Sequence, residues 1–305
     1  MDLFAAFILR CIRWFPLRVL RRFAKGLGIV TYHFAHSRRH IALSNLDLAY
    51  GNELTQGEKI RLAKGCFVNL ITTGLELCYA PKLPRPIGNM VDPTGKEHCL
   101  RAHANGKGVL LLVLHMGNWE VCARWLTENI PVVHVVVRRQ KQEWVERVVH
   151  RLRSDIGLLE IDKRNGLRGV LAALRRGELV VLAIDQHAHE GAVEVEFFGR
   201  PAMTSATAAV MAVRMDCSVL VGACHRNPDG GWGCCISEPF ETIRTADRRH
   251  DYVANTQRYV KVMETLIREH PADWMWMHRR WRPGRKRTDA ITAVASRTLP
   301  QRTEI

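Results

Sequence analysis

The chain has 305 residues, of which 47% are hydrophobic and 25% are charged, a balance typical of a globular protein whose core needs no disulfides. This composition excludes a chain that is disordered throughout, a collagen-like chain and a coiled coil. Lysine and arginine number 45 against 30 aspartates and glutamates, so the formal net charge is +15. A chain this basic favours an anionic partner, namely nucleic acid, an acidic protein or an anionic membrane surface, although an arginine-rich codon usage would also produce it.

Hydrophobic runs and cysteines limit the compartment and the cofactors. The longest stretch without Asp, Glu, Lys or Arg covers residues 201–213, shorter than the about 20 apolar residues that span a membrane. The nine cysteines are odd in number, and no pair has CxxC spacing. We therefore expect reduced and mostly buried thiols in a reducing compartment, no zinc site, and no cofactor of any kind.

The first 37 residues are predicted to form a separate helical segment without a cleaved signal peptide. Residues 3–9 are almost uncharged. Further on, Phe15, Val19 and Phe23 recur on one helical face, while arginines and a lysine occupy the other. Such a basic amphipathic pattern is typical of a helix that lies in a membrane interface. The alternative is a helix packed on the rest of the protein with its arginines in water.

The rest of the chain predicts helices first and then alternating strands and helices. Apolar residues at helical spacing predict helices over residues 38–50 and 57–79, before a proline-rich break. Continuous apolar runs then predict strands over residues 109–114, 132–137, 179–184 and 219–224. Helices are expected over residues 166–176, 204–215 and 247–270. This order predicts an α/β fold with a mainly parallel, helix-flanked sheet, one domain over residues 38–287 and a disordered tail over residues 288–305.

The segment HMGNWE, directly after the first apolar run, carries the strongest sign of chemistry. His115 follows the strand at the end where parallel α/β proteins place their ligands, and Glu120 comes five residues later. If Gly117 lets the chain turn sharply, Glu120 lies in the first helical turn and can hold one imidazole nitrogen. The other nitrogen is then free to act as a base. A pair that only caps the helix is the alternative.

HMGNWE resembles the HX4(D/E) motif of glycerolipid acyltransferases, and its Gly-Asn-Trp-Glu form is similar to the lipid A late acyltransferases, the lauroyl/myristoyl transferase family. Three more segments are similar to that family in the same order: RRHIALSNLDLAY at residues 38–50, Asp185-Gln186 with VEVEFFGRPA at residues 193–202, and WMWMHRRW at residues 274–281. The resemblance covers about residues 38–282. It implies a glycerol-3-phosphate acyltransferase-like fold and acyl transfer from a thioester to a lipid hydroxyl.

This resemblance also implies roles for individual residues. His115 would deprotonate the acceptor hydroxyl, and Glu120 would orient the imidazole and stabilise its cation. Arg138 and backbone N–H groups near Gly117 and Asn118 are the candidate oxyanion donors. Asp185 follows the predicted strand 179–184, so the strand-end rule places it in the same crevice, where it would position the substrate or Arg138; an N-cap or turn carboxylate is the alternative. The residues assigned to substrate binding are Asn118, Arg138, Asp185, Gln186, Arg279 and Arg280. In two places the chain departs from the family: only Arg138 remains of its Tyr-Arg-Pro, and HAHE follows Asp185-Gln186.

Two other clusters keep alternatives open. Asp185, His187, His189 and Glu190 resemble a metal cluster, which would make the protein a metal-dependent hydrolase. Six cations between Arg279 and Arg287 adjoin three tryptophans, a pattern that suits phosphorylated lipid, an acidic acyl carrier or single-stranded nucleic acid. The GGWGCC segment predicts a strand edge or hairpin.

The sequence thus predicts an acyltransferase at the cytoplasmic face of the inner membrane, peripheral or monotopic, with an anionic membrane surface as a partner. The donor is acyl-carrier protein or acyl-CoA, and the acidic carrier is favoured because this chain is basic. The acceptor is a lipid such as a lipid A precursor, while a lysophospholipid, an amino-lipid or a glycolipid stays open. A basic binding module without chemistry is the other alternative, and nucleic acid is not expected as a partner.

Overall fold

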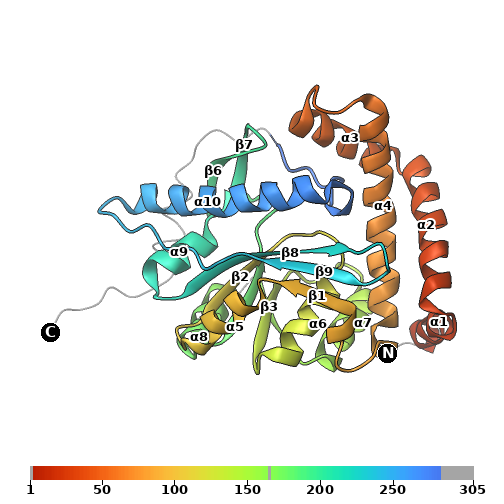
Figure 1. The fold of residues 1–305 in the computed structure, drawn as a ribbon, viewed down its shortest axis with the longest axis horizontal. Helices are drawn as coiled ribbons and strands as arrows, with labels where there is room; N and C mark the ends of the chain where they lie inside the picture. The colour runs from red at the N-terminus through yellow and green to blue at the C-terminus, as the bar shows by residue number, and fades with distance from the viewer. Residues whose placement is uncertain (1–2, 164–165, 283–305) are drawn as a thin grey trace.

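A seven-stranded sheet lies at the centre of the molecule (Figure 1). The computed structural model describes residues 3–163 and 166–282. The strand order is β1-β9-β8-β2-β5-β3-β4, and all neighbours are parallel except β8 and β9. The strands are β1 (Val91–Thr94), β2 (Val109–Val113), β3 (Val133–Val137), β4 (Leu158–Asp162), β5 (Leu179–Ala183), β8 (Ser218–Arg226) and β9 (Trp232–Ile236). The predicted mainly parallel α/β sheet is confirmed.

Helices cover both faces of this sheet, because strands that are apolar along their whole length need cover on each side. Successive residues of β2 serve two different cores: Leu110 and Leu112 pack in the cluster that includes α9 and α10, and Val109 and Leu111 pack in the cluster that includes α6. Figure 1 shows α10 and α6 on opposite sides of the sheet. The covering helices are α5 (Lys96–Ala104), α6 (Trp119–Asn129), α7 (Glu143–Asp155), α8 (Gly166–Arg175), α9 (Thr207–Arg214) and α10 (Arg248–Glu269).

Four helices precede the sheet and stand together at one end of the molecule (Figure 1). They are α1 (Leu3–Trp14), α2 (Leu17–Phe34), α3 (His36–Tyr50) and α4 (Gln56–Tyr79). Helix α2 packs along α4 through its buried residues Leu20, Ala24, Gly28 and Tyr32. The approach is closest at Gly28, where a Cβ atom would lie 2.6 Å from the Cα of Val68.

The opposite face of the α2 region is apolar and open. Its exposed large side chains are Phe15, Val19, Phe23, Leu27, Val30 and Phe34. They include all three residues of the predicted amphipathic face. Within the described residues, no helix combines the length and the apolar character that crossing a membrane requires.

The structure also departs from several sequence expectations. The helix predicted over residues 204–215 begins only at Thr207, because the chain before it forms the hairpin of β6 (Ala192–Phe197) and β7 (Arg200–Ser205). The GGWGCC segment does form a hairpin strand, β9, antiparallel to β8. Cys122 and Cys234 form a disulfide where reduced thiols were expected. These two cysteines are 112 residues apart in the sequence, so their spacing did not predict that they are in contact. The predicted tail, residues 288–305, lies outside the described residues.

Candidate active site

His115 lies just past the carboxyl end of β2 and is held there by Asp185, which follows β5. The imidazole Nδ1 is 2.8 Å from Oδ1 of Asp185, and the backbone N–H of His115 donates to Oδ2 at 2.9 Å. The indole Nε1–H of Trp274 donates to the same Oδ2 at 2.9 Å. Strands β2 and β5 are parallel neighbours with Val113 opposite Ala183, so both chains reach the site at the same height. The structure therefore pairs the histidine with a buried carboxylate 70 residues away.

The charges of this pair determine which nitrogen is free. Burial alone would raise the pKa of Asp185, but the imidazole and three N–H donors lower it to about 2. Burial alone would lower the pKa of His115, but the Asp185 carboxylate outweighs it and raises that pKa above 6.5. An ionised carboxylate only accepts, so Nδ1 carries the hydrogen and Nε2 carries the lone pair when the ring is neutral. With 28% of the side chain exposed, the imidazole remains accessible to a substrate.

A sharp turn carries the chain from His115 into α6. Gly117 has a φ of +57°, and a Cβ atom there would lie 2.3 Å from the carbonyl oxygen of Cys224. Glycine is therefore required at this position both by conformation and by space. The backbone N–H of Gly117 donates to the carbonyl of Asp273 at 3.1 Å, so this predicted oxyanion donor is already engaged.

Asn118 caps α6. Its Oδ1 accepts from the backbone N–H of Val121 at 3.1 Å, and its Nδ2 donates to Glu76 at 2.7 Å. The side chain is fully buried, and these two hydrogen bonds give it a structural role. Glu76 also accepts from Arg21, Arg226 and Trp232, and thus joins α2, α4, the turn before α6 and the β8–β9 hairpin.

Glu120 lies in the first turn of α6 as expected, but its hydrogen-bond partner differs from the predicted one. Among the hydrogen bonds of the described residues, its carboxylate accepts from Arg153 at 2.5 and 3.1 Å, and Asp185 takes the place expected for it on the imidazole. Arg153 also donates to Glu160 at 3.0 Å. The negative charge of Glu120 still contributes to raising the pKa of His115. The five-residue spacing indicated that Glu120 lies near the imidazole. It could not indicate that Asp185 is the carboxylate that hydrogen-bonds to the ring, because that contact depends on the order of the strands in the sheet.

A cavity of about 310 Å³ opens beside the imidazole. His115, Glu120, Arg138, Arg153 and Gln186 line it on the polar side. Its other walls are apolar and include Leu111, Val113, Trp119, Ala123, Val135, Val136 and Val181. The cavity therefore brings the imidazole of His115 and the cations Arg138 and Arg153 together with apolar walls. Such an arrangement can hold an apolar chain that ends in a polar reactive group.

The other predicted binding residues are divided between the cavity and the core. Gln186 has its Nε2 3.4 Å from Nδ1 of His115, and Arg138 is exposed at the cavity. Arg279 is exposed. Arg280 is 1% exposed and donates to Thr204 at 2.5 Å and to the carbonyl of Met203 at 2.8 Å. These hydrogen bonds join Arg280 to β7 in the interior of the protein.

The alternative metal cluster does not assemble. Asp185 is committed to His115 and Trp274, and His187 packs edge-on against His189. Over the part of the chain that the structure describes, the group of side chains spaced to share a metal ion is Cys122, Cys224 and Cys234.

Sequence reasoning missed Arg153, Glu76 and the role of Trp274. The role of Glu76 could have been suspected from the sequence, because a carboxylate within the predicted apolar helix 57–79 needs a buried partner. Arg153 lies in a helix that was not predicted, and Trp274 in a segment known only by its resemblance.

The whole chain was compared with known proteins. Residues 1–283 match the family described as bacterial lipid A biosynthesis acyltransferase. The lipid A biosynthesis lauroyltransferase of Escherichia coli (strain K12) is 28% identical over 275 residues, which are 88% of this chain and 86% of that protein. A lipid A biosynthesis acyltransferase of Haemophilus influenzae is 25% identical over 286 residues, 90% of this chain and 88% of that protein. A phosphatidylinositol mannoside acyltransferase of Mycobacterium tuberculosis (strain CDC 1551 / Oshkosh) is 27% identical over 205 residues, 66% and 62% of the two chains.

The fold and these relatives define an enzyme that transfers an acyl group to a lipid acceptor. The chain belongs to the bacterial lipid A biosynthesis acyltransferase family, as the four ordered motifs of its sequence implied.

Proposed function

We propose that this enzyme transfers a fatty acyl chain from the thioester of an acyl-carrier protein to a hydroxyl of a lipid A precursor. In the reaction, Nε2 of His115 takes the proton of the acceptor hydroxyl, and the oxygen attacks the thioester carbonyl. The tetrahedral intermediate then collapses, the C–S bond breaks, and the leaving thiolate takes the proton back from the imidazolium. The hydrogen bond between His115 and Asp185 is the observation that carries this proposal, because it leaves Nε2 free and stabilises the cation that forms.

The cavity supports a division of labour around the imidazole. Its apolar walls suit the acyl chain, and the reactive carbonyl would then lie beside His115 at the polar end. Arg138 keeps its proposed role as oxyanion donor, since it is exposed at this end of the cavity. We assign Glu120 a role in positioning Arg153, in addition to its effect on the charge of the imidazole.

The charge of the chain supports an acidic acyl-carrier protein as the donor. The chain carries a formal charge of +15, and an acidic carrier would be attracted over a Debye length of about 8 Å at physiological salt. The rate constant kcat/KM with the carrier-bound donor should therefore fall as salt rises. A response that is flat in salt would contradict docking of the carrier on a basic surface.

The acceptor is assigned from the relatives, two of which are named for lipid A biosynthesis. The purified enzyme should be given a labelled acyl-carrier donor and, in parallel, a lipid A precursor, a lysophospholipid and a phosphatidylinositol mannoside. Labelled product from the lipid A precursor alone supports the proposal. If labelled product forms only with another acceptor, the proposed acceptor is wrong and that lipid takes its place. His115→Ala should abolish transfer, whereas His250→Ala, at an exposed histidine near the start of α10, should not.

We also propose that the enzyme binds the cytoplasmic face of the inner membrane through the segment of residues 1–37. The exposed apolar row that includes Phe15, Val19 and Phe23 supports this, since a patch of that kind on a basic helix suits a lipid interface. Phe15→Ser/Phe23→Ser should weaken sedimentation with anionic vesicles, and a matched change on exposed residues of α7 should not. Unchanged sedimentation of the double variant would move the anchor elsewhere.

A further inference from the structure

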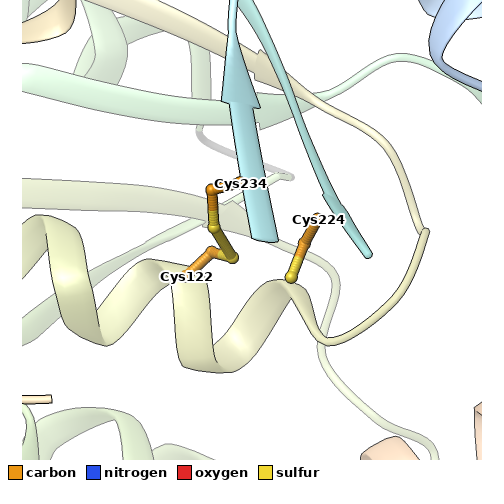
Figure 2. A group of neighbouring side chains, drawn as sticks. All are labelled: Cys122, Cys224 and Cys234. Atoms are coloured by element: carbon orange, nitrogen blue, oxygen red, sulfur yellow. A yellow bond between two sulfur atoms is a disulfide. The ribbon is translucent and has the colours of Figure 1, made fainter. Parts of the chain in front are cut away.

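Three cysteines meet at the wall of the cavity that His115 also lines. Cys122 comes from α6, Cys224 from β8 and Cys234 from β9 (Figure 2). Their sulfur atoms all lie within 4.8 Å of one another, and Cys122 and Cys234 are joined as a disulfide. Each of the three residues also lines the cavity.

The backbone fixes this group from two sides. Cys224 and Cys234 are directly opposite each other in the antiparallel β8–β9 pair, so their side chains project from the same face of the sheet. Cys122 reaches them from α6, which covers that face. Three rigid elements thus aim one sulfur each at a common point, and no loop has to move to bring the sulfurs together.

We propose that the reduced cluster of Cys122, Cys224 and Cys234 binds one thiophilic divalent ion of the zinc group. A Zn–S bond is about 2.3 Å long, so three thiolates around one ion lie about 3.8–4.0 Å apart. With the disulfide formed, the three sulfurs lie within 4.8 Å of one another, and after reduction those of Cys122 and Cys234 have to move apart from bonding distance to reach that spacing. Because all three residues line the cavity, a water molecule could take a fourth position from that side.

Metal binding should release protons, because a thiol loses its proton when it becomes a ligand. Burial raises the pKa of the Cys224 thiol to about 12, and its S–H donates to the carbonyl of Asn118 at 3.2 Å. Cys224 is therefore a thiol at neutral pH until an ion replaces its proton. Loading the fully reduced cluster should release three protons per ion.

The disulfide makes binding depend on the redox state. A dithiol reductant gives two electrons and two protons to the Cys122–Cys234 bond, becomes a disulfide itself, and leaves three free thiols at the site. In the oxidised protein the cluster keeps only the Cys224 thiol. Metal binding and the disulfide thus exclude each other, and this inference does not depend on the proposed function.

Cadmium serves as the probe, because thiolate-to-metal charge transfer makes its binding visible in the ultraviolet. The full-length protein is reduced, freed of reductant without air, and titrated with Cd²⁺. The double variant Cys122→Ser/Cys234→Ser measures binding by the other cysteines. We expect the reduced protein to bind one ion more than the double variant and to release three protons with it, and we expect the oxidised protein to match the double variant.

Single variants identify the ligands. Cys224→Ser should weaken binding at least tenfold and lower proton release to two per ion. Cys235→Ser, at the next residue of β9 but outside the cluster, should change neither value. The proposal is overturned if the reduced protein binds no more Cd²⁺ than the double variant, if the oxidised protein binds equally, or if Cys235→Ser acts like Cys224→Ser. If a variant has a lowered melting temperature, the comparison of Cd²⁺ binding by the reduced and the oxidised protein still tests the proposal, because it needs no substitution.

Discussion

Replacing Asp185 by asparagine should disable the proposed catalytic base while leaving His115 in place. The backbone N–H of His115 and the indole N–H of Trp274 both donate to one carboxylate oxygen. In Asp185→Asn the amide oxygen must occupy that position, because only it can accept these two hydrogen bonds. The amide nitrogen then faces Nδ1 of the imidazole and donates to it. This reverses the tautomer, so Nε2 carries the hydrogen and cannot take a proton from the acceptor.

The expected loss is large because it affects the base itself. In a serine protease triad, the same substitution leaves the geometry intact and lowers the rate by ~10⁴ through the wrong tautomer. We expect a loss of ~10³–10⁴ in kcat/KM here, which corresponds to ~4–5.5 kcal/mol of transition-state stabilisation. The pH profile should shift as well. In the wild type the acid limb should lie above pH 6.5, since Asp185 raises the pKa of His115. Without that carboxylate, burial lowers the pKa, and the limb of the residual activity should move to lower pH.

The assay is transfer of a labelled acyl chain from carrier protein to lipid, measured between pH 5 and 9 with folding checked by thermal melting. Asp162→Asn is the matched control, because Asp162 ends β4, which β3 separates from β5, and pairs with Arg139 at the surface. The control should keep nearly full activity and the wild-type pH profile. If Asp185→Asn melts like the wild type and keeps more than a tenth of its activity, Asp185 does not set the tautomer. An acid limb that stays in place would refute the electrostatic part of the reasoning.

Other substitutions test the packing that surrounds the site. Gly117→Ala should lower transfer at least tenfold with little change in helix content by circular dichroism, since the positive φ and the nearby carbonyl leave no room for a Cβ. Gly28→Ala should destabilise the protein in urea, because overpacking costs ~1–3 kcal/mol and outweighs the ~1 kcal/mol gained in helix propensity; Gly26→Ala, with nothing within 4 Å of its added methyl, should stabilise instead. Glu76→Ala should cost ~3–5 kcal/mol in the same assay, since it leaves two partly buried arginines without their carboxylate. Equal stability of the two glycine variants, or a cost below 1 kcal/mol for Glu76→Ala, would contradict these accounts.

Sequence reasoning could single out the candidate site because its main signal is local. A continuous apolar run ending at His115, and another ending just before Asp185, mark strand ends without any knowledge of the fold. The pairing between them was not predictable in this way, because it depends on β5 lying beside β2, and the order of strands in a sheet is not written in their spacing. For the same reason Glu120 was given the partner that is nearest in sequence. The contact of Cys122 with Cys234 likewise exists only once α6 covers the β8–β9 hairpin.

Because β2 and β5 meet in a fixed register, the proposed base also reports on how the sheet assembles. Val113 lies opposite Ala183, an offset of 70 residues, and the same offset separates His115 from Asp185. A slip of one residue would turn one of the two side chains to the other face of the sheet and break the pair. Helices can form early in refolding, but this pair requires two strands distant in sequence to dock in one register. Recovery of acyl transfer during refolding should therefore lag behind the return of helical circular dichroism, and a single-residue deletion within β5 should yield a helical but inactive protein.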